Sequence, residues 1–200
     1  VALASSIGDS EEFMGLRDYR PGDPLQRIHW KSFARAGEPI VKEYQDEFFE
    51  RHALVLDTFG GADAAFEEAV SIAASFVYTI NTQECLLDLM FVGSEAYCYT
   101  AGRGQLQTGN LLEILAGVQP CSDKPFQVLH EAVLAQRAAL SGCICILLAW
   151  DEARQACVRQ LHALGVPLRA ILVTSGAIAD PPAWLIVLEP GKVQEGLGKL

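Results

Sequence analysis

Long apolar runs are missing from this chain of 200 residues. The longest uninterrupted run of hydrophobic residues is 143–150, eight residues long. A membrane-spanning helix needs about 20 apolar residues, so we expect this chain to be soluble. It also lacks a signal-peptide pattern and begins at Val1 rather than at Met. We therefore expect a piece excised from a longer protein.

Motifs for nucleotide binding and hydrolysis are missing too. The sequence contains no GxxxxGK[ST] phosphate loop, no GxGxxG after its first predicted strand and no GxSxG around a nucleophilic serine. The four histidines are scattered. The six cysteines are too sparse for a disulfide scaffold, which favours free thiols in a reducing compartment, and Cys143 and Cys145 lack the second pair that zinc needs. We expect no enzyme.

Positive charge is scarce outside one segment. The net charge is −10, yet residues 15–42 hold six basic and three acidic side chains. That segment carries +3, so the remainder carries −13. An acidic surplus of this size argues against nucleic-acid binding. The charge asymmetry is local.

What is present is an alternation of strand and helix patterns after residue 52. This alternation predicts an α/β fold, Rossmann-like, with a mostly parallel central sheet and helices on both faces. Strands are predicted over 53–56, 86–92, 96–100, 143–149, 168–173 and 184–188, the second and third as a hairpin, with helices over 63–80, 105–117, 127–140 and 152–164.

The chain divides into three parts on these patterns. We expect an N-terminal extension over 1–52, an α/β domain over 53–188 and a C-terminal tail over 189–200. In the extension, Asp23 followed by Pro24 is typical of a helix N-cap and first helical residue, which predicts a short helix over about 24–35.

Two aspartates follow predicted strands directly. Asp57 comes after strand 53–56 and Asp151 lies just beyond strand 143–149. If these strands are central neighbours, both carboxylates face the crevice where such sheets bind ligands, and two oxygen ligands suit Mg²⁺. The alternative is that each aspartate caps the helix after it. Spacing alone favours the alternative.

The cationic segment carries a family resemblance. The string GLRDYRPGDPLQRIHWKSFARAGEPIVKEYQDEF, followed by an apolar strand ending in Leu-Asp, closely resembles the bacterial family catalogued as domain of unknown function 58 (DUF58), which is related to von Willebrand factor A domains. The matching residues are Arg17, Tyr19, Pro21, Gly22, Asp23, Arg27, Ile28, His29, Trp30, Ala34, Arg35 and Asp57.

This resemblance implies a fold, a setting and a partner. It implies an A-type domain with strand order 3-2-1-4-5-6, in which Asp57 and Asp151 face each other. It implies a longer parent protein held at the cytoplasmic face of the bacterial inner membrane by N-terminal membrane helices outside this chain. It also implies a protein partner, a MoxR-type AAA+ ATPase, and a role in protein assembly or maturation.

One departure from the A-domain pattern affects metal binding. A-type domains that bind metal use DxSxS after the first strand, a threonine and a further aspartate. Here the stretch after the strand is Asp-Thr-Phe-Gly-Gly, so Phe59 and Gly61 replace both serines, and Thr100 is a loose candidate for the threonine. We expect a degenerate site made of Asp57 and Asp151, empty or weakly binding Mg²⁺, and no other cofactor.

The resulting hypothesis is a non-enzymatic protein-interaction module. Its docking surface is predicted at the carboxyl-end rim of the sheet, around Phe59, Thr100 and Arg103, where Phe59 either anchors a partner or folds onto the adjacent helix. The signature residues are predicted to be structural, with Trp30 as a buried anchor whose loss costs about 3 kcal/mol. The alternatives are a Mg²⁺-dependent adhesion-like domain and a phosphate- or nucleotide-binding protein that uses the arginine-rich segment.

Overall fold

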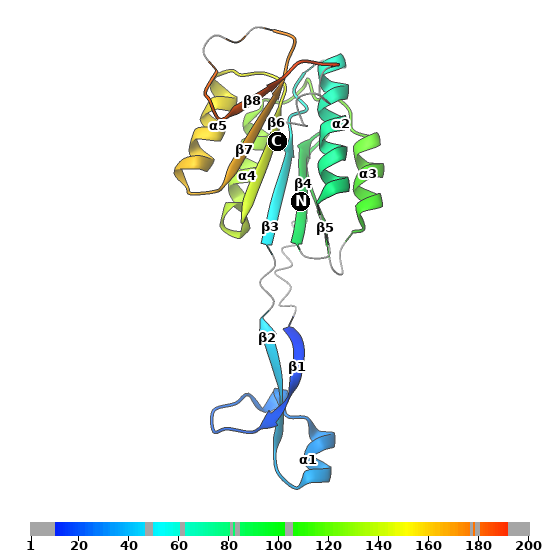
Figure 1. The fold of residues 1–200 in the computed structure, drawn as a ribbon, viewed down its shortest axis with the longest axis vertical. Coiled ribbons are helices and arrows are strands. Elements are labelled where there is room, and N and C mark those ends of the chain that lie inside the picture. Colours follow the sequence, from blue (N-terminus) through cyan, green and yellow to red (C-terminus); the bar gives the residue numbers. More distant parts are fainter. Residues whose placement is uncertain are drawn as a thin grey trace. The chain divides into compact units, whose positions relative to one another are not determined.

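The computed structural model describes residues 11–46, 50–60, 63–80, 82, 85–102, 106–176, 178 and 181–191. It forms two compact units, Val1–Phe48 and Phe49–Leu200 (Figure 1). The boundary predicted between residues 52 and 53 falls inside the first strand of the second unit. Of the predicted tail, 189–200, residues 192–200 lie outside the described residues.

The first unit is a two-stranded antiparallel ribbon with a helical excursion. Strands β1 (Glu11–Asp18) and β2 (Ile40–Asp46) pair so that Asp18 faces Ile40, with a bulge between Phe13 and Gly15. Between them lie a 3-10 turn, η1 (Leu25–Arg27), and a short helix, α1 (Trp30–Ala36). Gly37 ends α1 in the left-handed conformation that glycine adopts without strain.

The predicted helix over 24–35 is wrong in its first half. Residues 25–27 form one 3-10 turn, Ile28 is extended and bridges to Val41, and α1 starts only at Trp30. Asp23 caps no helix, because its carboxylate accepts hydrogen bonds from an arginine side chain and from the Arg20 backbone instead. A competing charged donor therefore overrides the capping preference of Asp23.

The second unit has a six-stranded sheet in the order β5-β4-β3-β6-β7-β8. Neighbouring strands are parallel except for the edge strand β5, which returns antiparallel to β4 through a hairpin. The predicted fold class and hairpin are confirmed. The strands are β3 (Glu50–Leu56), β4 (Cys85–Val92), β5 (Ala96–Ala101), β6 (Gly142–Leu147), β7 (Leu168–Val173) and β8 (Leu185–Leu188).

Helices cover both faces of this sheet (Figure 1). Alternate residues of β3 point to opposite faces: Leu54 and Leu56 pack in the core with α2 and α3, whereas Ala53 and Val55 pack in the core with α4 and α5. Strands buried on both faces need continuous apolar sequence, which explains the runs seen in the sequence. The helices are α2 (Ala64–Thr79), α3 (Thr108–Ala116), α4 (Gln127–Gln136), followed by the 3-10 turn η2 (Arg137–Ala139), and α5 (Glu152–Ala163).

The strand order determines where the residues of the candidate site lie. Numbered within the unit, the strands run 3-2-1-4-5-6, the order that the resemblance implies. The order reverses between β3 and β6, which pair in parallel, so the residues after these two strands meet at one edge of the sheet. Within the described part of the chain, no helix combines the length and apolar character needed to cross a membrane.

Candidate functional site

Asp57 lies at the carboxyl end of β3 and is completely buried. Its Oδ1 accepts hydrogen bonds from the Phe59 backbone N–H (2.9 Å) and from Arg154 Nη2 (3.1 Å). Its Oδ2 accepts from the Leu148 backbone N–H (3.0 Å) and from Arg154 Nε (2.6 Å). A carboxylate has about four lone-pair positions, so all the acceptor capacity of Asp57 is in use.

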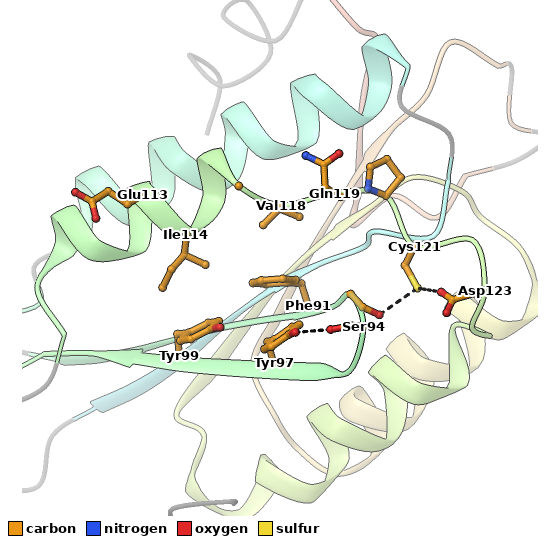
Figure 2. Close-up of a pocket in the computed structure, with 13 residues that line it drawn as sticks. Phe91, Ser94, Tyr97, Tyr99, Glu113, Ile114, Val118, Gln119, Cys121 and Asp123 are labelled. Carbon is orange, nitrogen blue, oxygen red and sulfur yellow. Dashed lines mark hydrogen bonds between the residues drawn. The ribbon is translucent and has the colours of Figure 1, made fainter. Parts of the chain in front are cut away.

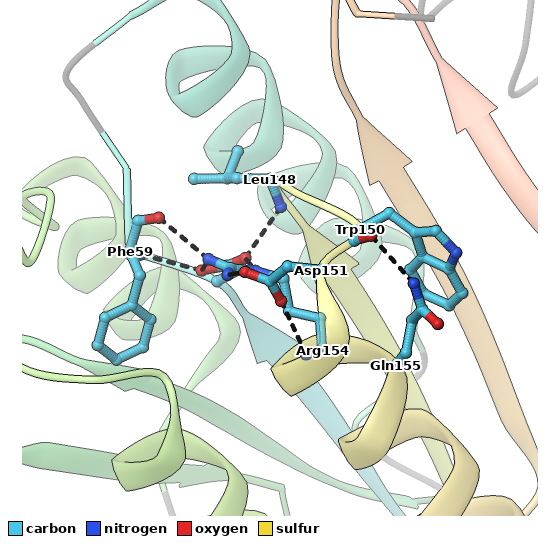
Figure 3. Close-up of polar contacts among 7 residues, drawn as sticks. Phe59, Leu148, Trp150, Asp151, Arg154 and Gln155 are labelled. Carbon is cyan, nitrogen blue, oxygen red and sulfur yellow. Dashed lines mark hydrogen bonds and ion pairs between the residues drawn. The ribbon is translucent and has the colours of Figure 1, made fainter. Parts of the chain in front are cut away.

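Arg154, in the first turn of α5, supplies the charge that neutralises Asp57. The side chain is almost entirely buried, and Nη2 also donates to the Phe59 carbonyl oxygen (3.1 Å) while Nη1 donates to Asp151 Oδ2 (2.5 Å) (Figure 3). The guanidinium carbon lies 4.8 Å from the centre of the Phe126 ring. Burial alone would lower the pKa of Arg154, but hydrogen bonds and charge from Asp57 outweigh it and raise the pKa above its usual value.

Asp151 is the helix cap that the spacing favoured, and it also makes an ion pair that the sequence analysis did not predict. Its Oδ1 accepts from the Arg154 backbone N–H (3.0 Å), so it caps α5, and its Oδ2 holds the Arg154 side chain. Asp57 does not cap the helix that follows it, because Asp63 accepts from the Phe66 backbone and caps α2. The two aspartates do meet across the switch point, joined by one guanidinium.

This geometry does not fit a divalent ion. The guanidinium stands between the two carboxylates, and Asp57 has no lone pair left for a metal. The hydroxyl of Thr58, the residue after Asp57, is buried and donates to the Val92 carbonyl oxygen (2.6 Å). Among the residues that the structure describes, no group of three or more His, Cys, Asp or Glu side chains could hold a metal ion.

Thr100 lies away from this edge, which corrects its predicted place in the rim. It pairs with Asp88 near the start of β4, because β5 runs antiparallel and returns to the opposite edge of the sheet. There its hydroxyl donates to Asp88 Oδ1 (2.6 Å) and accepts from Arg51 Nη2 (3.3 Å). Arg51 Nε donates to the buried Asp88 carboxylate at 2.6 Å. Thr100 therefore completes a second ion pair, between a partly exposed arginine and a buried aspartate.

Phe59 and Arg103 are the other two residues of the predicted rim. Phe59 is half-buried, and its ring packs edge-on against Phe126 at the start of α4, with 5.7 Å between ring centres. Of the two alternatives for Phe59, the structure has the ring folded onto the adjacent helix. Arg103 lies outside the described residues.

The signature residues of the first unit hold a tight turn. Arg17 Nη1 and Nη2 donate to the two oxygens of Asp23 at 2.7 and 2.8 Å. The Arg20 backbone N–H donates to the same carboxylate (2.8 Å), and Gly22 takes a positive φ of 109° that the turn requires. The Arg17 side chain and the Arg20 backbone lower the pKa of Asp23 to about 2.

Trp30 is not the buried anchor that the sequence predicts. It is 62% exposed and makes an edge-on contact with Phe33 (6.0 Å between ring centres), while His29 shares a hydrogen bond with Ser32 (Nδ1 to Oγ, 2.6 Å). Among the described residues, the strands and short helix of this unit bury only the apolar side chains of Ile28 and Val41, and the indole lies at the surface. The remaining signature residues, Tyr19, Pro21, Arg27 and Arg35, all lie in this same unit.

The sequence analysis missed Arg154, although a signal was present. Arg154 precedes Cys157, Val158 and Leu161 by three, four and seven positions, so it lies on the same stripe of α5 as three buried apolar residues. An arginine on a buried stripe needs a buried partner. Asp57, at the end of a buried strand, was the available carboxylate.

Comparisons with known proteins agree with this architecture. A family model described as "Protein of unknown function DUF58" matches residues 15–158 and so covers the signature, Asp57 and Arg154. The "Uncharacterized protein YeaD" of Bacillus subtilis (strain 168) is 29% identical over 101 residues, which are 50% of this chain and 25% of that protein. This chain thus spans about a quarter of the length of that relative.

Among solved structures, the manganese-loaded Plasmodium vivax TRAP protein has a similar fold, with a TM-score of 0.50 and 10% identity over 76% of this chain and 72% of that one. At this identity the likeness concerns the fold. The family match extends over most of the chain and includes the signature turn and the residues of the buried site. The chain belongs to the DUF58 family and has a von Willebrand factor A-like fold.

Proposed function

We propose that this chain is a non-enzymatic protein-interaction module that works without a bound metal ion. The observation that carries the proposal is the Asp57 carboxylate, whose four acceptor positions are filled by two backbone N–H groups and by Arg154. The solved protein of similar fold is described as manganese-loaded. In this chain a guanidinium provides positive charge at the switch point of the sheet.

The side chains of the described residues give little support to catalysis. In this part of the chain, one serine and one histidine share a hydrogen bond, Ser32 and His29. No carboxylate contact to the imidazole accompanies it among the described residues, whereas a catalytic pair needs a third group to orient the base. Asp57 is buried with all its acceptor positions filled, and Arg154 is almost entirely buried and paired with it, which argues against a role for either as a base or a substrate ligand.

The exposed side chains of the first unit support placing the docking surface there. Trp30 (62% exposed) and Leu25 (66% exposed) lie on a segment with a net charge of +3, and Arg35 is exposed beside them in sequence. An exposed tryptophan with arginines is the composition of an interface hot spot. The surface fits an acidic partner, and the family resemblance favours a MoxR-type AAA+ ATPase, with the parent protein anchored in the membrane by segments outside this chain.

Biolayer interferometry with a MoxR-type ATPase from the same organism tests the proposal. Replacing Trp30 by Ala and Arg35 by Glu should weaken capture at least about tenfold, the scale of losing a hot spot, without changing the melting temperature. The matched control is Trp184→Ala with Arg159→Glu, which removes an indole of similar exposure (54%) and an exposed arginine from the second unit.

The same assay separates the alternatives. Capture should be equal in EDTA and in excess Mg²⁺ or Mn²⁺, whereas a requirement for either ion would reject a metal-independent module. Phe59→Ala with Arg103→Glu should leave capture intact. If this rim variant alone abolishes binding, docking occurs at the carboxyl-end rim and the first unit is not the interface.

A further inference from the structure

A pocket of about 520 Å³ opens on the second unit beside its edge strand. Figure 2 shows the rings of Phe91, Tyr97 and Tyr99 side by side on one wall, with Ile114 and Val118 across from them. The volume falls in the range of about 300–1,000 Å³ that is usual for small-ligand sites, so it admits a long side chain with its flanking backbone.

The three rings form one continuous surface because of strand register. Phe91 on β4 is the direct cross-strand partner of Tyr97 on β5, and Tyr99 lies two residues further along the same face. Ring centres are 5.3 Å apart for Phe91 and Tyr97, and 5.8 Å apart for the two tyrosines, whose planes differ by 10°. The Tyr97 hydroxyl is held by Ser94 at 2.6 Å, which fixes this ring.

The fold leaves this aromatic surface partly uncovered. Helix α3 ends at Ala116, and the chain then crosses back toward β3, where the Cys121 N–H donates to the Thr58 carbonyl oxygen (2.7 Å). Both tyrosines consequently remain half-exposed. Because both partly exposed rings line the pocket, they offer an aromatic wall to a ligand.

The charged side chains that line the pocket are acidic: Glu113 and Asp123 line it, and no basic residue in the described part of the chain does. Lys124 lies beside the Asp123 end, where it donates to the Gly93 carbonyl oxygen (3.2 Å). Asp123 accepts from the Cys121 thiol (3.3 Å) and from Lys124 (3.2 Å), and both contacts lower its pKa. The described residues provide no ion-pair partner for the exposed Glu113 carboxylate, which lies at the Ile114 end of the pocket (Figure 2).

We infer that this pocket binds an arginine side chain presented by a segment of a partner protein. A planar guanidinium stacks on aromatic faces and is less strongly hydrated than an ammonium group, so flat rings beside an unpaired carboxylate favour arginine. In the bound state the guanidinium lies over Tyr97 and Tyr99 and pairs with Glu113. The inference is independent of the proposed function, because the pocket lies on the second unit and requires a cationic ligand.

The test is an NMR titration of the 200-residue chain with acetyl-Gly-Arg-Gly-amide. The peptide should shift the backbone amide signals of residues 91–99 and 113–121. The same peptide with citrulline, which keeps the shape of arginine and loses the charge, should shift none of them. Equal binding of the two peptides, or no shift with the arginine peptide, would overturn the inference.

Variants complete the test. Glu113→Gln should weaken binding about threefold, the scale of one exposed ion pair, and Tyr99→Leu about fivefold, the scale of one exposed cation–π contact. Glu131→Gln, which neutralises an exposed carboxylate on α4 outside the pocket, should have no effect. If Tyr99→Leu fails to fold, Glu113→Gln decides alone, and wild-type affinity in that variant would reject the site.

Discussion

In the first unit, the described residues bury two apolar side chains, Ile28 and Val41, whereas the second unit buries a core on each face of a six-stranded sheet. The residues that carry the resemblance to the family, Asp57 excepted, lie in the unit with the small core. A large core needs hydrophobic pattern and volume, which many sequences supply. A surface that binds needs particular side chains, and this difference supports placing the binding function in the first unit.

The Arg17–Asp23 pair of the first unit and the Arg154–Asp57 pair of the second unit differ in burial. The side chains of Arg17 and Asp23 are 33% and 17% exposed, whereas those of Arg154 and Asp57 are 7% and 0% exposed. An ion pair near water contributes little to global stability, but an unpaired charge in a core is costly. Substitutions in both units and an acid titration can test these differences.

Replacing Arg154 by Met should have the largest effect. It leaves the Asp57 carboxylate buried without its counter-charge, which costs about 3–5 kcal/mol of unfolding free energy. Urea denaturation followed by circular dichroism measures the loss. Arg159→Met, on the same helix but in an exposed pair with Glu152, should cost less than about 1 kcal/mol.

The matching double variant tests the cause. Asp57→Asn combined with Arg154→Met removes both charges and should recover part of the stability that Arg154→Met loses, because no unpaired buried charge remains. If Arg154→Met and Arg159→Met prove equally stable, the buried pair is not what holds the switch point together.

Trp30→Ala should have a much smaller effect on stability than a core truncation. Leu54 is completely buried, so Leu54→Ala should lower the unfolding free energy by about 2–5 kcal/mol. Because Trp30 is exposed, Trp30→Ala should lower it by less than about 1 kcal/mol. Thermal loss of the NMR amide signals of residues 15–43 reports on the first unit, and those of the β3 residues report on the second. A large loss for Trp30→Ala would show that the indole is buried in solution.

The exposed pair should be visible in an acid titration. The Arg17 hydrogen bonds lower the pKa of Asp23 to about 2, against an unperturbed value of about 3.9. Because the folded-state pKa is depressed, the contribution of the pair to folding is complete above about pH 4 and is lost as the pH falls toward about 2. The carboxyl ¹³C shift of Asp23 should titrate near 2, and in Arg17→Gln nearer its ordinary value. A wild-type midpoint near 4 would contradict the pairing.

The sequence predicted the fold well because the signals for it are local and repeated. Apolar runs and helical spacing identified the strands and helices of the second unit, and the aspartates at two strand ends were placed at the right edge. Thr100 was misplaced although the hairpin was predicted. The second strand of a hairpin runs antiparallel, so its last residues lie at the opposite edge of the sheet, and the rim prediction did not apply this.

The candidate site was less predictable because its chemistry depends on a contact between residues 97 positions apart. Asp57 suggested an empty or weak metal site, whereas Arg154 fills the same space from α5. The prediction that Trp30 is buried failed for a different reason. A tryptophan in a polar segment was assigned to a core, but the first unit buries very few side chains. Burial depends on the whole unit and not on the side chain alone.

The central claim is that Arg154 takes the place of a metal ion between Asp57 and Asp151. Isothermal titration calorimetry of the purified chain with Mg²⁺ and with Mn²⁺ tests it most directly. No saturable heat should be seen for binding tighter than millimolar, because Asp57 has no free lone pair. A micromolar isotherm that disappears in Asp57→Asn would contradict the claim.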